Sequence, residues 1–249
     1  MSIRPKKWLG QNFLTDRKTL EFEVSAAGVC GKDTVLEIGP GDGRLTRLLA
    51  ERAKRVVAVE KDLEMAKFLE GLPENVELVF GDFTKLQPLP EFNKVVANIP
   101  YNLSSKIAFI LLEGHGFEVA VLTFQKEFAE RLVGRPGTKN WGRLSATVSF
   151  LANVELLKTV PAGAFYPKPK VDSAVVRIIP KEKPEGWEST KRAINALFTN
   201  PGKTVKNALK GKTDSEIPEE FRGKRVRRLS PGELEALGAA CFRAQNIFK

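Results

Sequence analysis

The tetrapeptide Asn98-Ile99-Pro100-Tyr101 follows the apolar run 95–97 and carries unusual chemistry for the end of a strand. The asparagine side chain offers an oxygen that accepts hydrogen bonds, and the carbonyl of Ile99 or Pro100 can supply a second acceptor. Two fixed acceptors suit methylation of an exocyclic amine on a base. The lone pair of such an amine is delocalised into the ring, and hydrogen bonds from both N–H groups favour its sp³ form. Pro100 restricts the backbone, and Tyr101 offers a face for base stacking. Alone, the tetrapeptide is also typical of a turn with a surface tyrosine.

Three glycines, Gly39, Gly41 and Gly43, lie between the apolar run 34–38 and a helical pattern. Glycine allows positive φ angles and a close approach of the backbone to a ligand. The spacing is not that of the G-x-G-x-x-G dinucleotide fingerprint, so it does not by itself indicate a phosphate site. An ordinary strand-to-helix turn has the same appearance.

Two carboxylates follow the next two predicted strands. Glu60 lies 21 residues after Gly39, where an acid can accept hydrogen bonds from both ribose hydroxyls. Asp82 ends the third strand, where a carboxylate can accept from an adenine amino group, with Phe83 beside the ring. Because the carboxyl ends of parallel strands meet at one edge, these groups predict a site for an adenosine-containing ligand. S-adenosylmethionine fits better than NAD, and the sequence contains no triphosphate loop with a Walker lysine.

Short apolar runs alternate with amphipathic segments through the first part of the chain. This alternation predicts an α/β fold with a doubly wound, mostly parallel sheet. A helical pattern over 142–154 and two more strands, over 154–160 and 173–180, come next; these two strands are candidates for an antiparallel pair. The earlier strands are predicted over 34–39, 55–60, 76–80, 94–99 and 118–124, and the helices between them over 43–53, 62–72, 104–113 and 125–134.

A change of pattern after residue 180 indicates a second domain. Segment 181–186 is charged, contains proline and lacks apolar periodicity, which is typical of a linker. Helical patterns then cover 189–198 and 230–248, and the second begins with Ser230 and Glu233 in a capping-box arrangement. We therefore predict a nucleotide-binding domain over 1–180, with a basic arm over 1–16, and a small helical RNA-binding domain over 181–249.

The net charge of +10 comes from the two ends of the chain. Residues 1–18 hold five Lys and Arg against one acid, and residues 181–249 hold fifteen against nine, whereas residues 19–180 hold twenty of each. A polyanionic partner such as nucleic acid would explain this distribution, and so would simple solubility. The basic residues predicted to bind RNA are Arg4, Lys6, Lys7, Lys168, Lys170, Lys224, Arg225, Arg227 and Arg228.

Several classes of protein are disfavoured. Cys30 and Cys241 lie far apart and lack metal-ligand spacing, and the single histidine, His115, lies in a predicted loop. No apolar run has the ~18 residues that a membrane helix needs, and no apolar signal core follows the basic N-terminus. We expect a cytoplasmic, monomeric protein that binds no metal and no membrane.

Seven motifs together resemble the ribosomal RNA adenine N6,N6-dimethyltransferases, the KsgA family, and especially their archaeal and eukaryotic branch. Each motif is only moderately specific, but their joint order and spacing is highly specific. They are GQNFLTD (10–16), EIGPGDGRLT (37–46), VVAVEKD (56–62), GDF (81–83), NIPYNLSS (98–105), FQKEFAERL (124–132) and FYPKPKVDSAVVRI (165–178).

The resemblance implies a Rossmann-like class I methyltransferase sheet, mostly parallel with an antiparallel strand near its edge. It also implies that the arm over 4–13 is a lid over the methyl donor, although its charge equally suits nucleic-acid binding. The implied roles are Asn12 and Leu14 closing over the donor, Gly39 with Gly41 against its methionine part, Glu60 on the ribose, Asp82 with Phe83 at the adenine, Asn98, Pro100 and Tyr101 at the target adenine, and Phe165 on that base's other face.

The function implied is two methyl transfers from S-adenosylmethionine to each of two adjacent adenines near the 3′ end of small-subunit ribosomal RNA, on a pre-30S particle. One alternative is an antibiotic-resistance type of methylase acting on large-subunit RNA; the helical domain and the motif PKVDS argue against it. A second is an RNA-binding assembly factor without turnover. A third is a methylase of DNA adenine or of protein glutamine, which shares the logic of the two acceptors.

Overall fold

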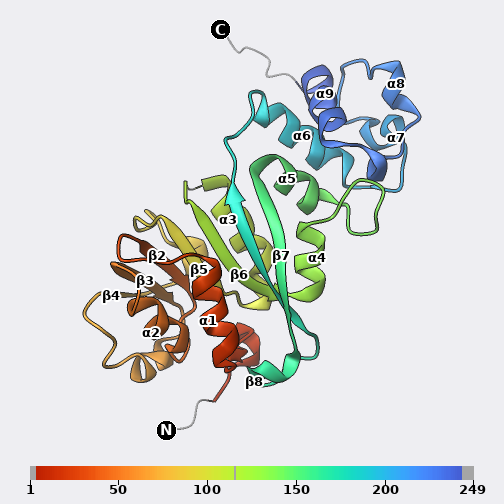
Figure 1. Ribbon diagram of the computed structural model, residues 1–249. Helices are drawn as coiled ribbons and strands as arrows, with labels where there is room; N and C mark the ends of the chain where they lie inside the picture. The colour runs from red at the N-terminus through yellow and green to blue at the C-terminus, as the bar shows by residue number, and fades with distance from the viewer. Residues whose placement is uncertain (1–3, 115, 243–249) are drawn as a thin grey trace. The chain divides into compact units, whose positions relative to one another are not determined.

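A sheet of seven strands, in the order β4-β3-β2-β5-β6-β9-β7, lies at the centre of the larger part of the molecule (Figure 1). The computed structural model describes residues 4–114 and 116–242, and this strand count refers to them. Strands β2 to β6 pair in parallel, whereas β9 runs antiparallel to β6. The predicted mostly parallel sheet is confirmed. Its strands are β2 Thr34–Ile38, β3 Arg55–Glu60, β4 Val76–Phe80, β5 Lys94–Asn98, β6 Val119–Gln125, β7 Ala152–Val160 and β9 Ser173–Pro180.

The strand pleat decides which side chains reach the site. Alternate residues of a strand face opposite sides of the sheet. Val96 of β5 and Val121 of β6 are buried in one apolar cluster with side chains of α1 (Arg17–Ala26) and α2 (Arg44–Ala50). Asn98 and Thr123 lie two residues further along the same strands and therefore face the same side, toward α1. They are also register partners across β5 and β6.

Helix α1 is an element that the sequence analysis did not predict. It begins after Asp16, whose carboxylate accepts hydrogen bonds from the backbone N–H and the hydroxyl of Thr19, at 3.0 and 2.6 Å. This is an N-cap, which satisfies an otherwise unpaired donor of the first turn. The helix buries Leu20 and Val24 against the sheet and also buries the carboxylate of Glu23.

A second, two-stranded sheet joins the N-terminal arm to the segment before β9. Strand β1 (Phe13–Leu14) pairs antiparallel with β8 (Phe165–Tyr166), so that Leu14 lies opposite Phe165. This pairing fixes where the arm ends, and no local signal in either dipeptide indicated it.

The chain divides into two compact units, Met1–Ala129 with Val154–Pro180, and Glu130–Asn153 with Lys181–Lys249. The predicted boundary after residue 180 coincides with one of these limits. Segment 130–153 differs from the prediction, because it belongs to the second unit rather than to the domain expected over 1–180. Aromatic contacts explain the difference: the rings of Phe150 and Trp187 lie 5.8 Å apart, and those of Trp141 and Phe198 lie 6.1 Å apart.

The second unit is helical in its described residues, as expected. The predicted capping box is present in α9, where Ser230 N–H donates to Glu233 Oε2 at 2.8 Å. The predicted extension of this helix to 248 runs into 243–249, which lie outside the described residues, as does His115. The helices of the chain beyond α2 are α3 Ser104–Gly114, α4 Lys126–Leu132, α5 Arg143–Leu151, α6 Trp187–Leu197, α7 Val205–Leu209, α8 Glu219–Arg222 and α9 Pro231–Cys241.

Two predicted helices are shorter than expected. The pattern over 62–72 forms only a 3₁₀ helix, Leu63–Phe68. The pattern over 142–154 ends at Leu151, where the chain passes directly into β7 with Ala152 already extended.

Candidate active site

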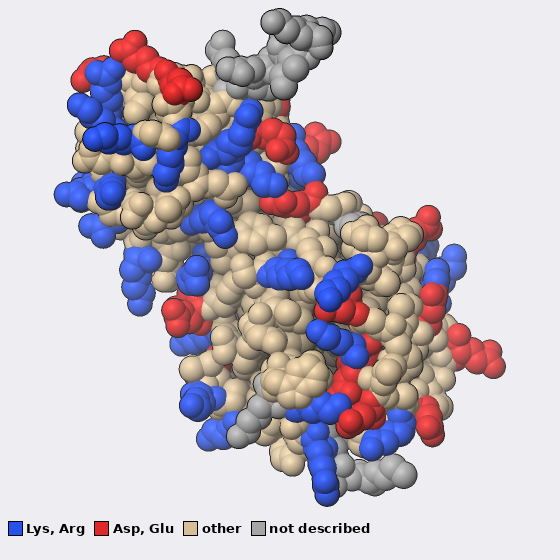
Figure 2. Space-filling model, turned by 180° about the vertical axis from the view of Figure 1, so that it is seen from behind, with Lys and Arg blue, Asp and Glu red and all other residues tan. Residues whose placement is uncertain are grey.

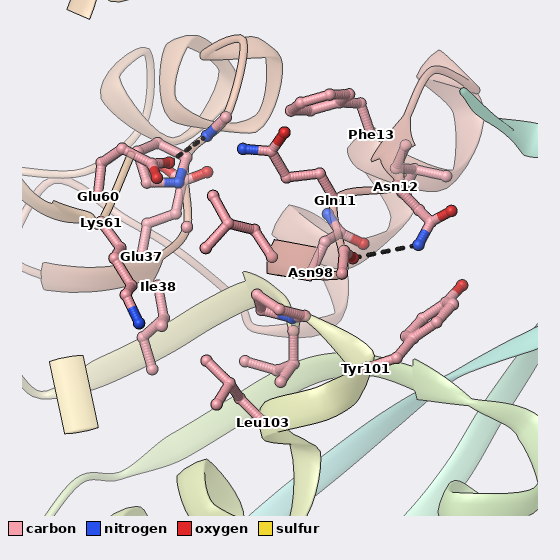
Figure 3. A pocket seen from close by; sticks show the side chains of 18 of the residues that line it. Gln11, Asn12, Phe13, Glu37, Ile38, Glu60, Lys61, Asn98, Tyr101 and Leu103 are labelled. Atoms are coloured by element: carbon pink, nitrogen blue, oxygen red, sulfur yellow. Dashed lines mark hydrogen bonds between the residues drawn. The ribbon is translucent and has the colours of Figure 1, made fainter. Parts of the chain in front are cut away.

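A cavity of about 160 Å³ lies at the carboxyl ends of β2, β3 and β5 in the first unit (Figure 3). The strand order reverses between β2 and β5, and open α/β sheets bind ligands in the crevice at such a point. Every residue predicted for catalysis or for the methyl donor contributes to the lining. These are Asn12, Leu14, Gly39, Gly41, Glu60, Asp82, Phe83, Asn98, Pro100, Tyr101 and Phe165.

The glycine turn forms one wall. Gly39, Gly41 and Gly43 have φ angles of 76°, 57° and 76°, in the left-handed region that glycine adopts readily. A β carbon on Gly41 would lie 2.8 Å from two ring carbons of Phe13. The turn therefore needs glycine at this position both for its backbone and for the approach of the arm.

Glu60 ends β3 beside this turn and is 6% exposed. One carboxylate oxygen accepts from Gly41 N–H at 3.1 Å, and the other accepts from Asp62 N–H at 2.7 Å. Burial raises the pKa of this carboxyl, and the two backbone hydrogen bonds oppose the rise. A carboxylate oxygen has room for two donors, so each oxygen of Glu60 keeps one free acceptor position.

Asp82 already has partners within the protein. Its Oδ1 accepts from the backbone N–H and the hydroxyl of Thr84, and its Oδ2 accepts from Lys61 Nζ at 3.0 Å. Burial alone would raise the pKa of Asp82, but these hydrogen bonds lower it to about 2. The carboxylate is therefore ionised at neutral pH. Phe83, the next residue, is buried in the cavity wall.

Asn98 is held by a carboxylate that the sequence analysis missed. Its Nδ2 donates to Glu23 Oε2 at 3.2 Å, and Thr123 Oγ1 donates to Glu23 Oε1 at 2.5 Å. The Oδ1 of Asn98 is buried and has no hydrogen-bond partner among the described residues. An N-cap at Asp16 was the local signal that would have placed Glu23 on a helix facing the sheet.

Tyr101 begins a 3₁₀ helix, Tyr101–Leu103, directly after Pro100. Its hydroxyl lies 2.7 Å from Ser173 Oγ at the start of β9, and burial raises its pKa, so the phenol is neutral. Phe165 is buried in the lining of the same cavity. Ser173 is another residue that the sequence analysis did not assign to the site.

The N-terminal arm is tied to the end of β3. Lys6 Nζ lies 2.7 Å from Asp62 Oδ1 and 3.0 Å from Glu64 Oε1, and Gln11 Nε2 donates to Asp62 Oδ2 at 2.8 Å. Asn12 Nδ2 donates to Gly10 O at 3.1 Å, within the arm itself (Figure 3). These contacts make the arm a cover of the cavity.

One family model, described as Ribosomal RNA adenine dimethylase, matches residues 3–236. The chain belongs to the ribosomal RNA adenine dimethylase family. The resemblance found in its motifs is thus confirmed, and its members are methyltransferases.

Two curated relatives extend the finding. One from Methanopyrus kandleri is 46% identical over 96% of this chain and 92% of that protein, and one from Thermococcus gammatolerans is 45% identical over 94% and 88%. Both are named probable ribosomal RNA small subunit methyltransferase A.

Two solved structures share the fold, which confirms the Rossmann-like methyltransferase architecture. A dimethyladenosine transferase from Plasmodium falciparum has a TM-score of 0.79 and 29% identity, over 92% of this chain and 99% of that one. The 23S rRNA methyltransferase ErmE has a TM-score of 0.71 and 32% identity, over 92% and 98%.

The basic residues predicted to bind RNA in the first unit of this family member have different environments. Arg4, Lys168 and Lys170 are exposed. Lys6 is a correction, because its charge is paired with Asp62 and Glu64 and holds the arm. The side chain of Lys7 lies outside the described part of the chain.

In the second unit, the predicted cluster lies on a loop and the 3₁₀ helix Val226–Arg228, and Figure 2 shows other Lys and Arg side chains over this unit with acidic ones among them. Lys224 forms an ion pair with Glu233, and Arg225 donates to Gly202 O. Arg227 and Arg228 are exposed. The carbonyl of Arg227 accepts from Gly137 N–H at 2.8 Å, which brings the loop around Gly137 next to the cluster.

The described residues contain no helix that is both long enough and apolar enough to cross a membrane. Within the same residues, no group of His, Cys, Asp and Glu side chains is arranged to hold a metal ion. Cys30 is exposed and Cys241 is buried, and both are free thiols.

Proposed function

We propose that this chain transfers methyl groups from S-adenosylmethionine to N6 of two adjacent adenines near the 3′ end of small-subunit ribosomal RNA, giving N6,N6-dimethyladenine. The side-chain oxygen of Asn98 carries the proposal, because it is buried in the cavity lining without a partner among the described residues. Leaving a buried acceptor unpaired costs about 1–3 kcal/mol. An N–H of the target amine would satisfy this acceptor.

The cavity's polar groups fit a methyl donor that contains adenosine. Glu60 keeps free acceptor positions for ribose hydroxyls, and Asp82 Oδ2 keeps one for an adenine amino group. Gly39 and Gly41 let the backbone approach the rest of the donor. When bound, S-adenosylmethionine supplies a sulfonium-linked methyl group to the N6 lone pair, the C–S bond breaks with its electrons going to sulfur, and N6 loses a proton.

The second acceptor is best assigned to the carbonyl of Ile99. The carbonyl of Pro100 already accepts from Leu103 N–H at 2.9 Å. Ile99 N–H donates to Thr123 O at 3.1 Å, which holds this peptide against β6. Acceptors fixed in this way stabilise positive charge developing on N6 without reorganising during the transfer.

Tyr101 and Phe165 are suited to hold the target base. Both line the cavity, and the hydrogen bond from Tyr101 to Ser173 restrains the phenol ring. Base stacking on an aromatic ring contributes roughly 1–3 kcal/mol.

The names of the curated relatives support a small-subunit substrate, and the charge distribution supports RNA. The second unit holds 19 Lys and Arg against 10 Asp and Glu, whereas the first holds 21 against 20. A basic unit attracts a polyanion over a range that falls with salt. We expect the protein to act as a cytoplasmic monomer on small-subunit particles.

A labelled-donor assay on assembled but unmodified small subunits tests this proposal. We expect label in N6,N6-dimethyladenine from two adjacent positions of the RNA. Asn98→Ala is expected to lower kcat by about 100-fold or more while RNA affinity stays nearly unchanged. Loss of RNA binding in this variant, or an inactive wild-type protein, would count against it.

The similarity to ErmE keeps one alternative open, methylation of large-subunit RNA. The same assay on both subunits, with primer extension to map the modified bases, separates the two substrates. An RNA-binding factor without turnover would bind the particle and transfer no label. DNA duplex and release-factor protein as competing substrates test the remaining alternative.

A further inference from the structure

Glu23 is a buried carboxylate in a position where a helix normally places an apolar side chain. It lies on the face of α1 that carries Leu20 and Val24 into the core, and it is 0% exposed. Burying a carboxylate is costly unless it is paired and hydrogen-bonded. Its partners therefore indicate what it contributes.

Both oxygens of Glu23 are used at the end of the sheet. Oε2 accepts from Asn98 Nδ2 at 3.2 Å, and Oε1 accepts from the Thr123 hydroxyl at 2.5 Å. Asn98 and Thr123 are register partners on β5 and β6, so a single carboxylate on α1 spans two strands. The strand pleat, which turns both side chains toward α1, makes this bridge possible.

The ionised carboxylate determines which end of the Asn98 amide faces the cavity. An ionised carboxylate only accepts hydrogen bonds, so it takes the NH₂ end and leaves Oδ1 for the cavity. A protonated Glu23 could donate to Oδ1 of a rotated amide, and the acceptor would then be lost to substrate. A hydrogen bond to a charged group is also stronger than a neutral one.

We propose that Glu23 is a positioning residue for methyl transfer, whose ionised carboxylate holds the Asn98 amide with Oδ1 directed to the target amine. This inference rests on the proposed function. Glu23 does not line the cavity and acts through Asn98 alone.

Charged groups on two other strands act on Glu23. Lys158 of β7 lowers the pKa of Glu23, and the two carboxyls of Glu23 and Glu37 (of β2) repel each other. Burial is the largest effect on each and raises their pKa values to about 7 and about 8. Because Asn98 and Thr123 contribute no charge, ionisation of Glu23 falls in the range where activity is measured.

Steady-state kinetics of Glu23→Gln and Glu23→Leu on unmodified small subunits test the inference, with Glu21→Gln as the matched control. Glu21 is on the same helix and pairs with Arg17 at the surface. We expect kcat to fall about tenfold in Glu23→Gln, where a neutral group no longer enforces the amide orientation. In Glu23→Leu we expect a fall of about 100-fold. KM for donor and for particle should stay within about twofold in both variants, because binding groups are unchanged.

The pH profile distinguishes positioning from a merely structural role. Wild-type kcat should rise with pH around 7 as Glu23 ionises, and this rise should be absent in Glu23→Gln. Unchanged kcat, or a pH profile that survives the substitution, would overturn the inference while wild-type activity upholds the proposed function. Wild-type protein without activity on either subunit would overturn the proposed function itself. Should Glu23→Leu fail to fold, Glu23→Gln alone decides.

Discussion

A β carbon on Gly41 would lie 2.8 Å from the ring of Phe13, so the glycine turn and the N-terminal arm pack with no space between them. Gly41 also has φ of 57° and donates its N–H to Glu60. One residue thus joins the donor-binding turn, the end of β3 and the cover of the cavity.

Gly41→Ala should therefore destabilise the fold and weaken donor binding. The left-handed backbone and the contact with Phe13 together cost about 1–3 kcal/mol, measured by urea unfolding. Calorimetry with S-adenosylhomocysteine should show a clearly weaker Kd. Gly31→Ala is the control, because its β carbon would meet nothing within 4 Å. Equal effects of the two substitutions would contradict the packing described here.

Lys6→Ala should shorten the time that a donor stays bound. The substitution removes the ion pairs to Asp62 and Glu64, and only Gln11 then ties the side chains of the arm to Asp62. A partly exposed pair contributes about 1 kcal/mol or less, so we expect an off-rate for S-adenosylhomocysteine that is raised up to about fivefold in stopped flow. Lys18→Ala, an exposed lysine on α1, is the control. A fall in RNA affinity without a change in this off-rate would return Lys6 to the RNA-binding group.

Arg227→Glu with Arg228→Glu should weaken RNA binding and flatten its salt dependence. Both residues are exposed in the basic second unit. Removing one cation that binds a phosphate reduces the slope of log affinity against log salt by about 1. Fluorescence anisotropy across a salt series measures the slope, with Lys32→Glu and Lys54→Glu in the first unit as the control pair. An unchanged slope would remove this segment from the RNA interface.

Local signals account for the parts of the fold and site that the sequence predicted. The strands have apolar runs, the turn has Gly39 and Gly41, and the polar side chains at positions 60, 82 and 98 follow strands directly. Parallel topology then brings them to one edge, as the cavity lining bears out. The capping box at Ser230 is likewise a contact between residues three apart.

Contacts between distant residues account for what was missed. The β1–β8 pair joins positions about 150 apart through two residues each, too few for a pattern. Lys6 was assigned to RNA from its charge alone, because its pairing with Asp62 depends on where the arm folds back. Glu23 interrupts the apolar face of α1, and only the tertiary structure reveals the amide and hydroxyl that it meets.

Glu23→Gln should make the protein more stable at high pH, although it makes the enzyme less active. The carboxyl has a pKa of about 7 when folded against 4.5 as its ordinary value, because burial disfavours the charge. Between these values the unfolded chain loses its proton first, so the free energy of unfolding falls as pH rises and is lower by about 3 kcal/mol above pH 7. Glutamine cannot ionise and does not incur this loss. Urea unfolding at pH 5 and pH 8 should therefore show the advantage of Glu23→Gln over wild type growing with pH, and Glu21→Gln should show no such growth. Parallel stability profiles for Glu23→Gln and wild type would mean that the carboxylate folds without the cost of burial, and that its hydrogen bonds to Asn98 and Thr123 fully offset the loss of water.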